Sequence, residues 1–212
     1  MTALSTTRAE ARRGHRSQRL ILHVSSNFAV GGSQVRFCQI ANALGDRFSH
    51  AVIAMDSCTD AAQLIESHVP FTVMSTPDAA GPLPRRLLRY RRLLSALQPD
   101  CMVTYNWGAI EWAMARLWGG PRHVHVEDGF GPDEADRQLP RRVAVRRLVL
   151  NRGSTLVVPS RVLKRLAREH WQIAPERIVY LPNGIDCDRY LRPPDPVLLE
   201  TLKLPRSTPL IG

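Results

Sequence analysis

The sequence lacks the features that mark several large classes of protein. No apolar run in its 212 residues approaches the roughly 20 residues of a membrane-spanning helix, which argues against an integral membrane protein. The first nineteen residues hold five arginines and one glutamate but no apolar core, so they do not resemble a secretory signal. We expect residues 1–19 to form a disordered basic arm, with an organellar transit peptide as the alternative.

The common metal and dinucleotide motifs are also absent. The four cysteines have none of the paired spacings of metal or redox sites, which predicts buried, reduced thiols in a cytosolic protein: Cys38, Cys58, Cys101 and Cys187. The sequence contains no G-x-G-x-x-G pattern of NAD or FAD binders and no calcium-binding loop. We therefore expect no metal site and no bound cofactor.

Negative charge is scarce. There are 29 Lys+Arg against 19 Asp+Glu, a formal net charge of +10. Such a balance predicts an anionic partner, which is a nucleic acid, an anionic membrane surface or a phosphorylated ligand. Aromatic residues make up only 6% of the chain and no recognition motif is present, so nucleic acid is the least favoured of the three.

Short β-branched segments alternate with helical patterns over most of the chain. The predicted strands are Leu20–Ser25, Ala51–Met55, Phe71–Met74, Cys101–Thr104, His123–Val126, Thr155–Val158 and Ile178–Leu181. The predicted helices are Gly32–Leu44, Ala61–His68, Leu83–Leu97, Ala109–Trp118, Arg141–Leu150 and Val162–His170. This alternation predicts an α/β fold, a Rossmann-like parallel sheet with helices on both faces.

The character of the sequence changes at Leu191. The segment "LRPPDPVLLETLKLPRSTP" carries five prolines, which is typical of a connector, and the final "LIG" begins like another strand. We predict a Rossmann-like domain over residues 20–190. Residues 191–212 are expected to form a connector and the first strand of a C-terminal domain that this chain lacks.

Two loops after predicted strands are candidates for ligand binding. In "LHVSSNFAVGGSQVRFCQIANAL", Gly31 and Gly32 let the backbone approach a ligand, and the following helix offers free N–H groups to an anion. Asn106 and Trp107 follow another strand, at the end where open α/β sheets bind ligands. Trp107 could stack on a sugar ring or could simply pack under the loop.

The most distinctive stretch is "VPSRVLKRLAREH…IVYLPNGID…RY", which runs from Val158 to Tyr190. It resembles the end of the N-terminal domain in the retaining, GT-B-fold glycosyltransferases of family 4. The "GGSQ…IANAL" loop and helix resemble the glycine-rich start of the same domain. The two matches frame almost all of residues 20–190 in the expected order.

The resemblance implies two Rossmann-like domains facing each other across a cleft. The first binds a glycan or lipid-linked acceptor, and the second binds a nucleotide-sugar, which is a co-substrate rather than a cofactor. In this family the loop matching Gly31 and Gly32 faces the phosphates of the donor. Asn106 and Trp107 fall where acceptor contacts are commonly found.

The stretch "HVEDGFGPDEADR" gathers five carboxylates into thirteen residues of this basic chain. Related enzymes often carry "EHG" where this chain has Glu127, Asp128 and Gly129, so Asp128 replaces the histidine. We expect Asp128 to orient or polarise the attacking hydroxyl, with Glu127 as a partner, although strand alternation points Glu127 the other way. The remaining three acids are expected to be solvated and to pair with arginines such as Arg137, Arg141 and Arg142: Asp133, Glu134 and Asp136.

The helix over residues 83–97 carries Arg85, Arg89 and Arg92 on one face and apolar residues on another. An ordinary surface helix explains this pattern, and so does peripheral binding to an anionic membrane. Lipid-linked acceptors are frequent in the family, which favours the membrane.

These observations together favour the acceptor-side half of a hexosyl-type glycosyltransferase in cell-envelope or surface-polysaccharide assembly. We expect a cytoplasmic protein, peripheral at the inner face of the membrane, whose chain 1–212 is inactive without a donor-binding domain. The alternative is a non-enzymatic module that binds a glycan or an anionic lipid.

Overall fold

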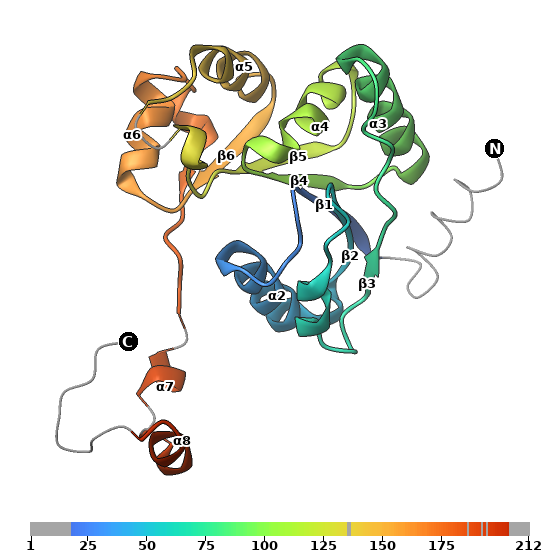
Figure 1. The fold of residues 1–212 in the computed structure, drawn as a ribbon. Helices are drawn as coiled ribbons and strands as arrows, with labels where there is room; N and C mark the ends of the chain where they lie inside the picture. The colour runs from blue at the N-terminus through green and yellow to red at the C-terminus, as the bar shows by residue number, and fades with distance from the viewer. Residues whose placement is uncertain (1–17, 135–136, 186, 192, 194, 204–212) are drawn as a thin grey trace. The chain divides into compact units, whose positions relative to one another are not determined.

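The computed structural model describes residues 18–134, 137–185, 187–191, 193 and 195–203 (Figure 1). The chain divides into two compact units, Met1–Pro182 and Asn183–Gly212. Most of the predicted basic arm and the predicted strand at "LIG" lie outside the described residues. The predicted domain boundary at residue 190 stays a prediction, while the compact unit itself ends at Pro182.

The first unit is built on a seven-stranded sheet in the order β3-β2-β1-β4-β5-β6-β7. All neighbouring strands pair in parallel, which confirms the predicted Rossmann-like fold. The strands are β1 (Arg19–Ser25), β2 (Phe48–Ala54), β3 (Phe71–Val73), β4 (Cys101–Tyr105), β5 (Arg122–Val126), β6 (Ser154–Val158) and β7 (Ile178–Tyr180).

The helices of this unit are α2 (Gly32–Leu44), α3 (Leu83–Leu97), α4 (Ile110–Ala115), α5 (Pro140–Leu150) and α6 (Arg161–Glu169). The predicted helix Ala109–Trp118 is shorter than expected, because 3₁₀ turns at Trp107–Ala109 and Arg116–Trp118 flank α4. The predicted helix Ala61–His68 is only a 3₁₀ helix, Asp60–Leu64. The helix ends at Leu64, and the N–H of Glu66 donates to Asn42 Oδ1 at 3.0 Å instead of to a carbonyl of a further helical turn.

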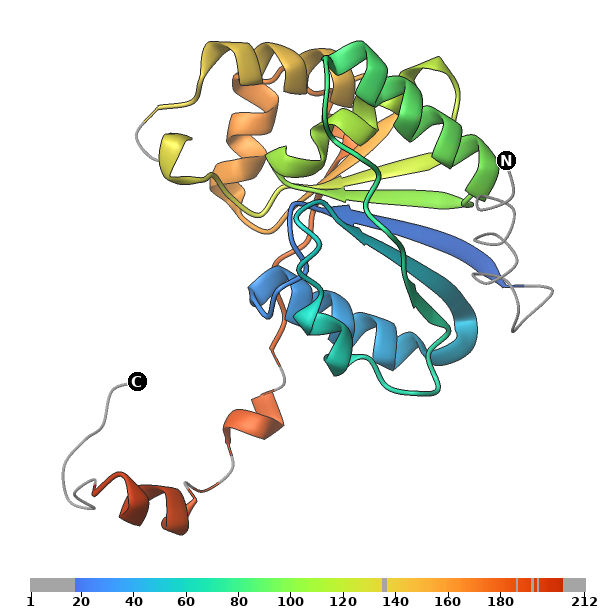
Figure 2. The same ribbon diagram turned by 45° about the vertical axis from the view of Figure 1, so that its right-hand side comes forward.

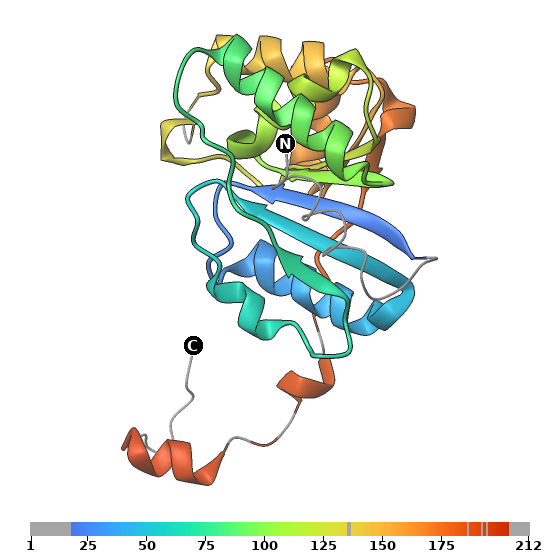
Figure 3. The same cartoon turned by 90° about the vertical axis from the view of Figure 1, so that its right-hand side faces the viewer.

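Helices cover both faces of the sheet, as Figures 1 and 3 show. Helix α2 and the segment Asp60–Leu64 pack on one face, around Phe28 and Phe37. Helices α3, α4, α5 and α6 cover the other face in two clusters. The side of α3 that meets the sheet carries its four buried residues, the apolar face expected from the sequence: Leu87, Tyr90, Leu94 and Leu97.

The second unit contains two short helices, α7 (Cys187–Tyr190) and α8 (Pro196–Thr201). Helix α8 was not predicted, although its start carries two ordinary signals. Asp195 caps it by accepting a hydrogen bond from the N–H of Val197 at 2.9 Å, and Pro196 occupies the first turn. Pro196 therefore lies at the start of a helix, in a segment that the sequence predicted to be a connector.

Two further expectations concern thiols and membrane spans. All four cysteines are free, and Cys38 is buried as predicted. Cys58 and Cys101 are only partly buried and Cys187 is exposed, so the expectation of buried thiols is wrong for these three residues. Among the described residues, no helix has both the length and the apolar character needed to cross a bilayer.

Candidate functional site at the carboxyl edge of the sheet

The candidate site lies where β1, β4 and β5 end. In a parallel sheet these ends share one edge, so the loops that follow them meet there. Figure 2 shows the blue loop that leads into α2 and the yellow loop after β5 on the same side of the sheet. Gly108 allows the loops after β1 and β4 to touch, because a Cβ there would lie 2.6 Å from the Cβ of Ser26.

The glycine loop leaves the start of α2 open to a ligand. Gly31 is the N-cap residue, and in the described structure no side chain caps this helix and no acid stands in its first turn. A Cβ placed on Gly32 would meet nothing within 4 Å. The first N–H groups of α2 therefore face space that an anion could occupy, with the positive end of the helix dipole behind them.

Asn106 and Asp128, each of which follows a strand as the sequence analysis placed it, contact each other at this edge. The N–H of Asn106 donates to the carbonyl of Val126 at 2.8 Å, and Asn106 Oδ1 accepts from the N–H of Asp128, also at 2.8 Å. Asn106 has a φ of 54° and a ψ of −171°, a strained backbone conformation outside the left-handed helical region, which glycine adopts far more readily than asparagine. The amide thereby fixes the backbone on which Asp128 stands.

The Asp128 carboxylate is paired with Arg36 of α2. Nη2 of Arg36 lies 2.8 Å from one oxygen and 3.0 Å from the other, and both side chains keep about a fifth of their surface exposed, 23% and 20%. Arg36 follows Gly32 by about one helical turn, so this ion pair joins the glycine loop to the acidic stretch. Nothing in the sequence around Arg36 marks it as a partner of the acidic stretch.

Glu127 points into the protein, as strand alternation indicated. It is fully buried, and its Oε2 accepts from Nε of Arg146 at 3.1 Å. Nε2 of His125 lies 3.6 Å from the same oxygen. Since the Glu127 side chain has no exposed surface, it contacts Arg146 rather than the crevice. It can therefore act on the neighbouring Asp128 only through the position of the backbone.

Glu134 belongs to the same buried cluster, so its predicted place in a solvated loop is wrong. It is 2% exposed and accepts hydrogen bonds from Arg142 and Arg146 at 3.0–3.2 Å. Burial raises the pKa of Glu134, but these bonds and one from the N–H of Leu139 outweigh it and hold the pKa below its usual value. Glu134 is therefore a structural carboxylate.

The other two acids of the stretch have different outcomes. Asp133 pairs with Arg142, as predicted, and half of its side chain is exposed. Asp136 lies outside the described residues.

Trp107 packs against this arginine cluster. The guanidinium carbons of Arg142 and Arg146 lie 4.9 and 5.2 Å from its ring centroid. Arg146 also lies over Phe130 and Trp171. The sequence left two roles open for Trp107, stacking on a sugar ring and packing under the loop. These contacts favour packing.

A recess beside the glycine loop is lined by Ser33 and Gln34 of α2 and by His23 and Tyr105 of the sheet. His23 Nδ1 lies 3.0 Å from the Tyr105 hydroxyl. Burial lowers the pKa of His23 well below its ordinary value, an effect that His50 increases, and burial raises the pKa of Tyr105. Both groups are therefore neutral near pH 7 and offer hydrogen bonds rather than charge.

Over the part of the chain that the structure describes, no group of three or more His, Cys, Asp or Glu residues is arranged to hold a metal ion. The edge of the sheet therefore presents three groups to a ligand. They are the open helix start at Gly31 and Gly32, the side-chain amide of Asn106, and the Asp128 carboxylate paired with Arg36.

The chain is similar to known proteins in sequence and in fold. The family model described as Glycosyltransferase Family 4 matches residues 30–189. Among solved structures, a glycosyltransferase from Rickettsia africae superposes with a TM-score of 0.65 at 15% identity, over 91% of this chain and 52% of that one. Anabaena HepE, solved in complex with UDP, gives a TM-score of 0.61 at 19% identity, over 86% of this chain and 50% of that one.

The chain thus spans about half the length of these two structural neighbours. None of the curated proteins is similar enough in sequence to count as a match.

Proposed function

Because the chain belongs to glycosyltransferase family 4, we propose that it is the acceptor-side half of an enzyme that moves a sugar from a nucleotide-sugar to a hydroxyl group, with retention of anomeric configuration. The observation that carries this proposal is the carboxyl edge of the sheet. There an open helix start at Gly31 and Gly32 lies on the same element as the arginine that binds Asp128. Helix α2 thus connects the loop proposed to bind phosphate with the carboxylate proposed to bind the hydroxyl.

We assign the residues of the site the following roles. Gly31 and Gly32 contact the phosphates of the donor through backbone N–H groups. Asn106 bonds acceptor hydroxyls and holds the backbone of Asp128. Asp128 orients or polarises the attacking hydroxyl, since a carboxylate accepts hydrogen bonds from sugar hydroxyls. Glu127, the predicted partner, is a positioning residue because it is fully buried against Arg146.

The nucleotide-sugar is a co-substrate, and we assign its main binding surface to a second domain. The support is that the chain spans about half of the glycosyltransferase from Rickettsia africae and of Anabaena HepE. Without that domain the leaving diphosphate contacts only the helix start at Gly31 and Gly32, which is not enough to position and stabilise it for transfer.

Product formation tests this assignment. Purified 1–212, incubated with nucleotide-sugars and hydroxyl acceptors, is expected to give no glycosylated product. Fusion to a donor-binding domain of the family is expected to give one. Turnover by 1–212 alone would contradict the assignment of donor binding to a second domain. Saturable glycan binding without product from any two-domain form would favour the non-enzymatic module instead.

We place the reaction in cell-envelope or surface-polysaccharide assembly, on the cytoplasmic side of a membrane. The support comes from α3 and its surroundings. Leu83, Leu88 and Trp118 are exposed beside Arg91, around a hollow of about 440 Å³. Exposed apolar side chains next to arginines suit the boundary between acyl chains and anionic headgroups, where tryptophan is enriched.

The three arginines expected to bind the membrane differ in their surroundings. Arg85 and Arg92 are exposed. Arg89 pairs with Asp78 at 3.1 Å and donates to the carbonyls of Asp78 and Ala80, so it also holds that loop. A clean test of membrane binding therefore changes Arg85 and Arg92 and leaves Arg89 in place.

Co-sedimentation with anionic vesicles is expected to weaken about 30-fold in Arg85→Gln/Arg92→Gln. Each basic side chain near an anionic leaflet contributes about 1 kcal/mol. A control of equal charge, Arg47→Gln/Arg152→Gln, removes two exposed arginines from other elements and should bind almost as well as the wild type. Equal binding by both variants, or binding that ignores the anionic lipid content, would refute the membrane role of α3.

A further inference from the structure

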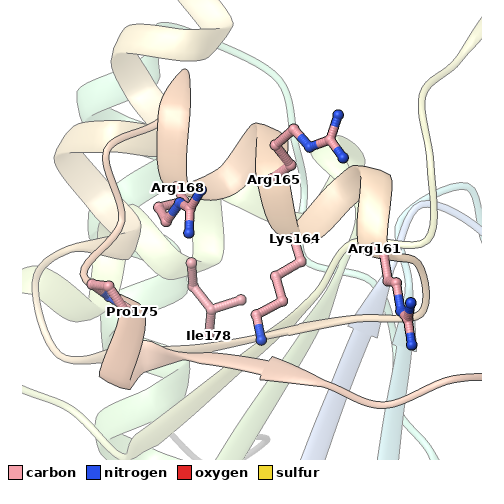
Figure 4. A pocket seen from close by; sticks show the side chains of 6 residues that line it. All are labelled: Arg161, Lys164, Arg165, Arg168, Pro175 and Ile178. Carbon is pink, nitrogen blue, oxygen red and sulfur yellow. The ribbon is translucent and has the colours of Figure 1, made fainter.

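A second basic surface lies on α6, far along the sheet from the glycine loop. Four cations of α6 line a hollow of about 340 Å³ whose other walls are Pro175 and Ile178: Arg161, Lys164, Arg165 and Arg168. We call these six residues the basic groove. In Figure 4, Lys164 and Arg168 extend toward Ile178, whereas Arg165 points away from it. Three strands separate β7, which carries Ile178, from β1, which leads into the glycine loop.

The cations of the basic groove have few partners. Over the described residues, Arg161, Lys164 and Arg165 have no side-chain hydrogen bond and no ion pair. Arg168 pairs with the adjacent Glu169 at 3.2 Å, and both of these side chains are largely exposed. On α3, two of the five arginines are paired, Arg86 with Glu111 at 2.5 Å and Arg89 with Asp78 at 3.1 Å.

The positions of these four cations destabilise α6. The four cations are spaced three and four residues apart, so each has like-charged neighbours on the same face, which destabilises a helix. Arg161 opens the helix and Lys164 follows in the next turn, where the positive end of the dipole disfavours cations. No acid stands in the first turn of α6 to compensate. Departures from such local rules concentrate at functional sites.

The chemistry of the groove identifies the class of ligand. Arginine and lysine donate several hydrogen bonds to phosphate oxygens, and a bound anion would remove the repulsion among the cations. Pro175 and Ile178 offer no charge of their own, so specificity for an anion comes from α6. We propose that the basic groove binds a ligand carrying two or more phosphate groups. This proposal does not depend on the proposed sugar transfer.

Calorimetric titration with pyrophosphate at low salt tests the proposal on the chain as it stands. In Arg161→Gln/Lys164→Gln/Arg168→Gln the Kd is expected to rise by about tenfold for each side chain removed, as for the loss of a charge-assisted hydrogen bond. The same variant should unfold at a higher temperature, because the repulsion within α6 is gone. A control variant, Arg47→Gln/Arg91→Gln/Arg152→Gln, removes the same charge from exposed arginines elsewhere and should keep its Kd within about twofold.

A Gly32→Ala variant separates the groove from the glycine loop, because the added Cβ enters open space and should leave the fold intact. Retained pyrophosphate binding in Gly32→Ala supports the groove. Loss of binding in Gly32→Ala, with retention in the groove variant, would overturn the proposal. Equal losses of pyrophosphate binding in the groove variant and the charge-matched control would also overturn the proposal. They would show that binding depends only on the net charge of the protein.

Vesicles containing phosphatidic acid then distinguish a lipid headgroup from a soluble ligand. If the groove variant loses vesicle binding and pyrophosphate competes with the vesicles, the phosphate belongs to a lipid. If pyrophosphate binds and the groove variant keeps its vesicle binding, the ligand is soluble. Unchanged binding of both probes in the groove variant would refute the site.

Discussion

Replacing Arg146 with methionine is expected to lower the free energy of unfolding by about 3–5 kcal/mol, the usual cost of removing one partner from a buried ion pair. Arg146 is 1% exposed and donates hydrogen bonds to Glu127 and Glu134. Methionine would fill much of the volume between the aromatic rings but would leave two buried carboxylates without their main donor. For a domain of this size, the melting temperature should fall by about 10 °C.

Two companion variants make this result specific. Arg141→Met makes the same change on the exposed side of α5 and should alter stability by no more than about 0.5 kcal/mol. Adding Glu127→Gln and Glu134→Gln to Arg146→Met removes the stranded charges and should recover part of the loss. Thermal unfolding followed by circular dichroism measures all three. An Arg146→Met protein that melts with the wild type would show that the cluster does not hold the acidic stretch.

In a two-domain form of the enzyme, Asp128→Asn is expected to lower kcat/KM at least about 100-fold, the lower range for loss of a general acid or base. Asparagine preserves the shape of the side chain and can still accept from Arg36, whose Nη2 lies 2.8 Å from the carboxylate. It loses the charge that polarises a hydroxyl. Because the side chain is 20% exposed at the carboxyl edge of the sheet, the loss should appear in the reaction rather than in folding.

Asp133→Asn is the matched control for Asp128→Asn. Asp133 belongs to the same stretch, but its carboxylate pairs with Arg142 and half of its side chain is exposed. Its kcat and acceptor KM should stay near those of the wild type. Near-normal kinetics for Asp128→Asn together with a loss in Asp133→Asn would show that the wrong acid has been assigned.

The fold could be predicted because its signals are local. Helix α3 begins and ends at the predicted residues, since its apolar positions repeat with helical spacing and Pro84 lies in its first turn. The rule that ligand-binding loops follow the carboxyl ends of parallel strands placed Asn106 and Asp128 at the same edge of the sheet, although their contact was not predicted. Periodicity and topology were sufficient for both.

The ion pairs could not be predicted, because they join side chains that are distant in sequence. Arg36 and Asp128 are 92 positions apart, and nothing in the helix around Arg36 marks it as a partner. Arg146 did carry a signal, since it lies between Val143 and Val149 on the side of α5 that meets the core. An arginine at an inward-facing position of a helix, between apolar residues, indicates a buried carboxylate nearby, which here means Glu127 and Glu134.

The most direct test of the central claim is to map nucleotide-sugar binding on ¹⁵N-labelled 1–212 by amide chemical shifts. We predict that the changes at the carboxyl edge of the sheet are largest on Gly31 and Gly32, and that Gly32→Ala weakens them. Changes confined to the opposite edge of the sheet, or changes at the carboxyl edge that Gly32→Ala leaves intact, would contradict the assignment of Gly31 and Gly32 as the donor contact at the site of sugar transfer.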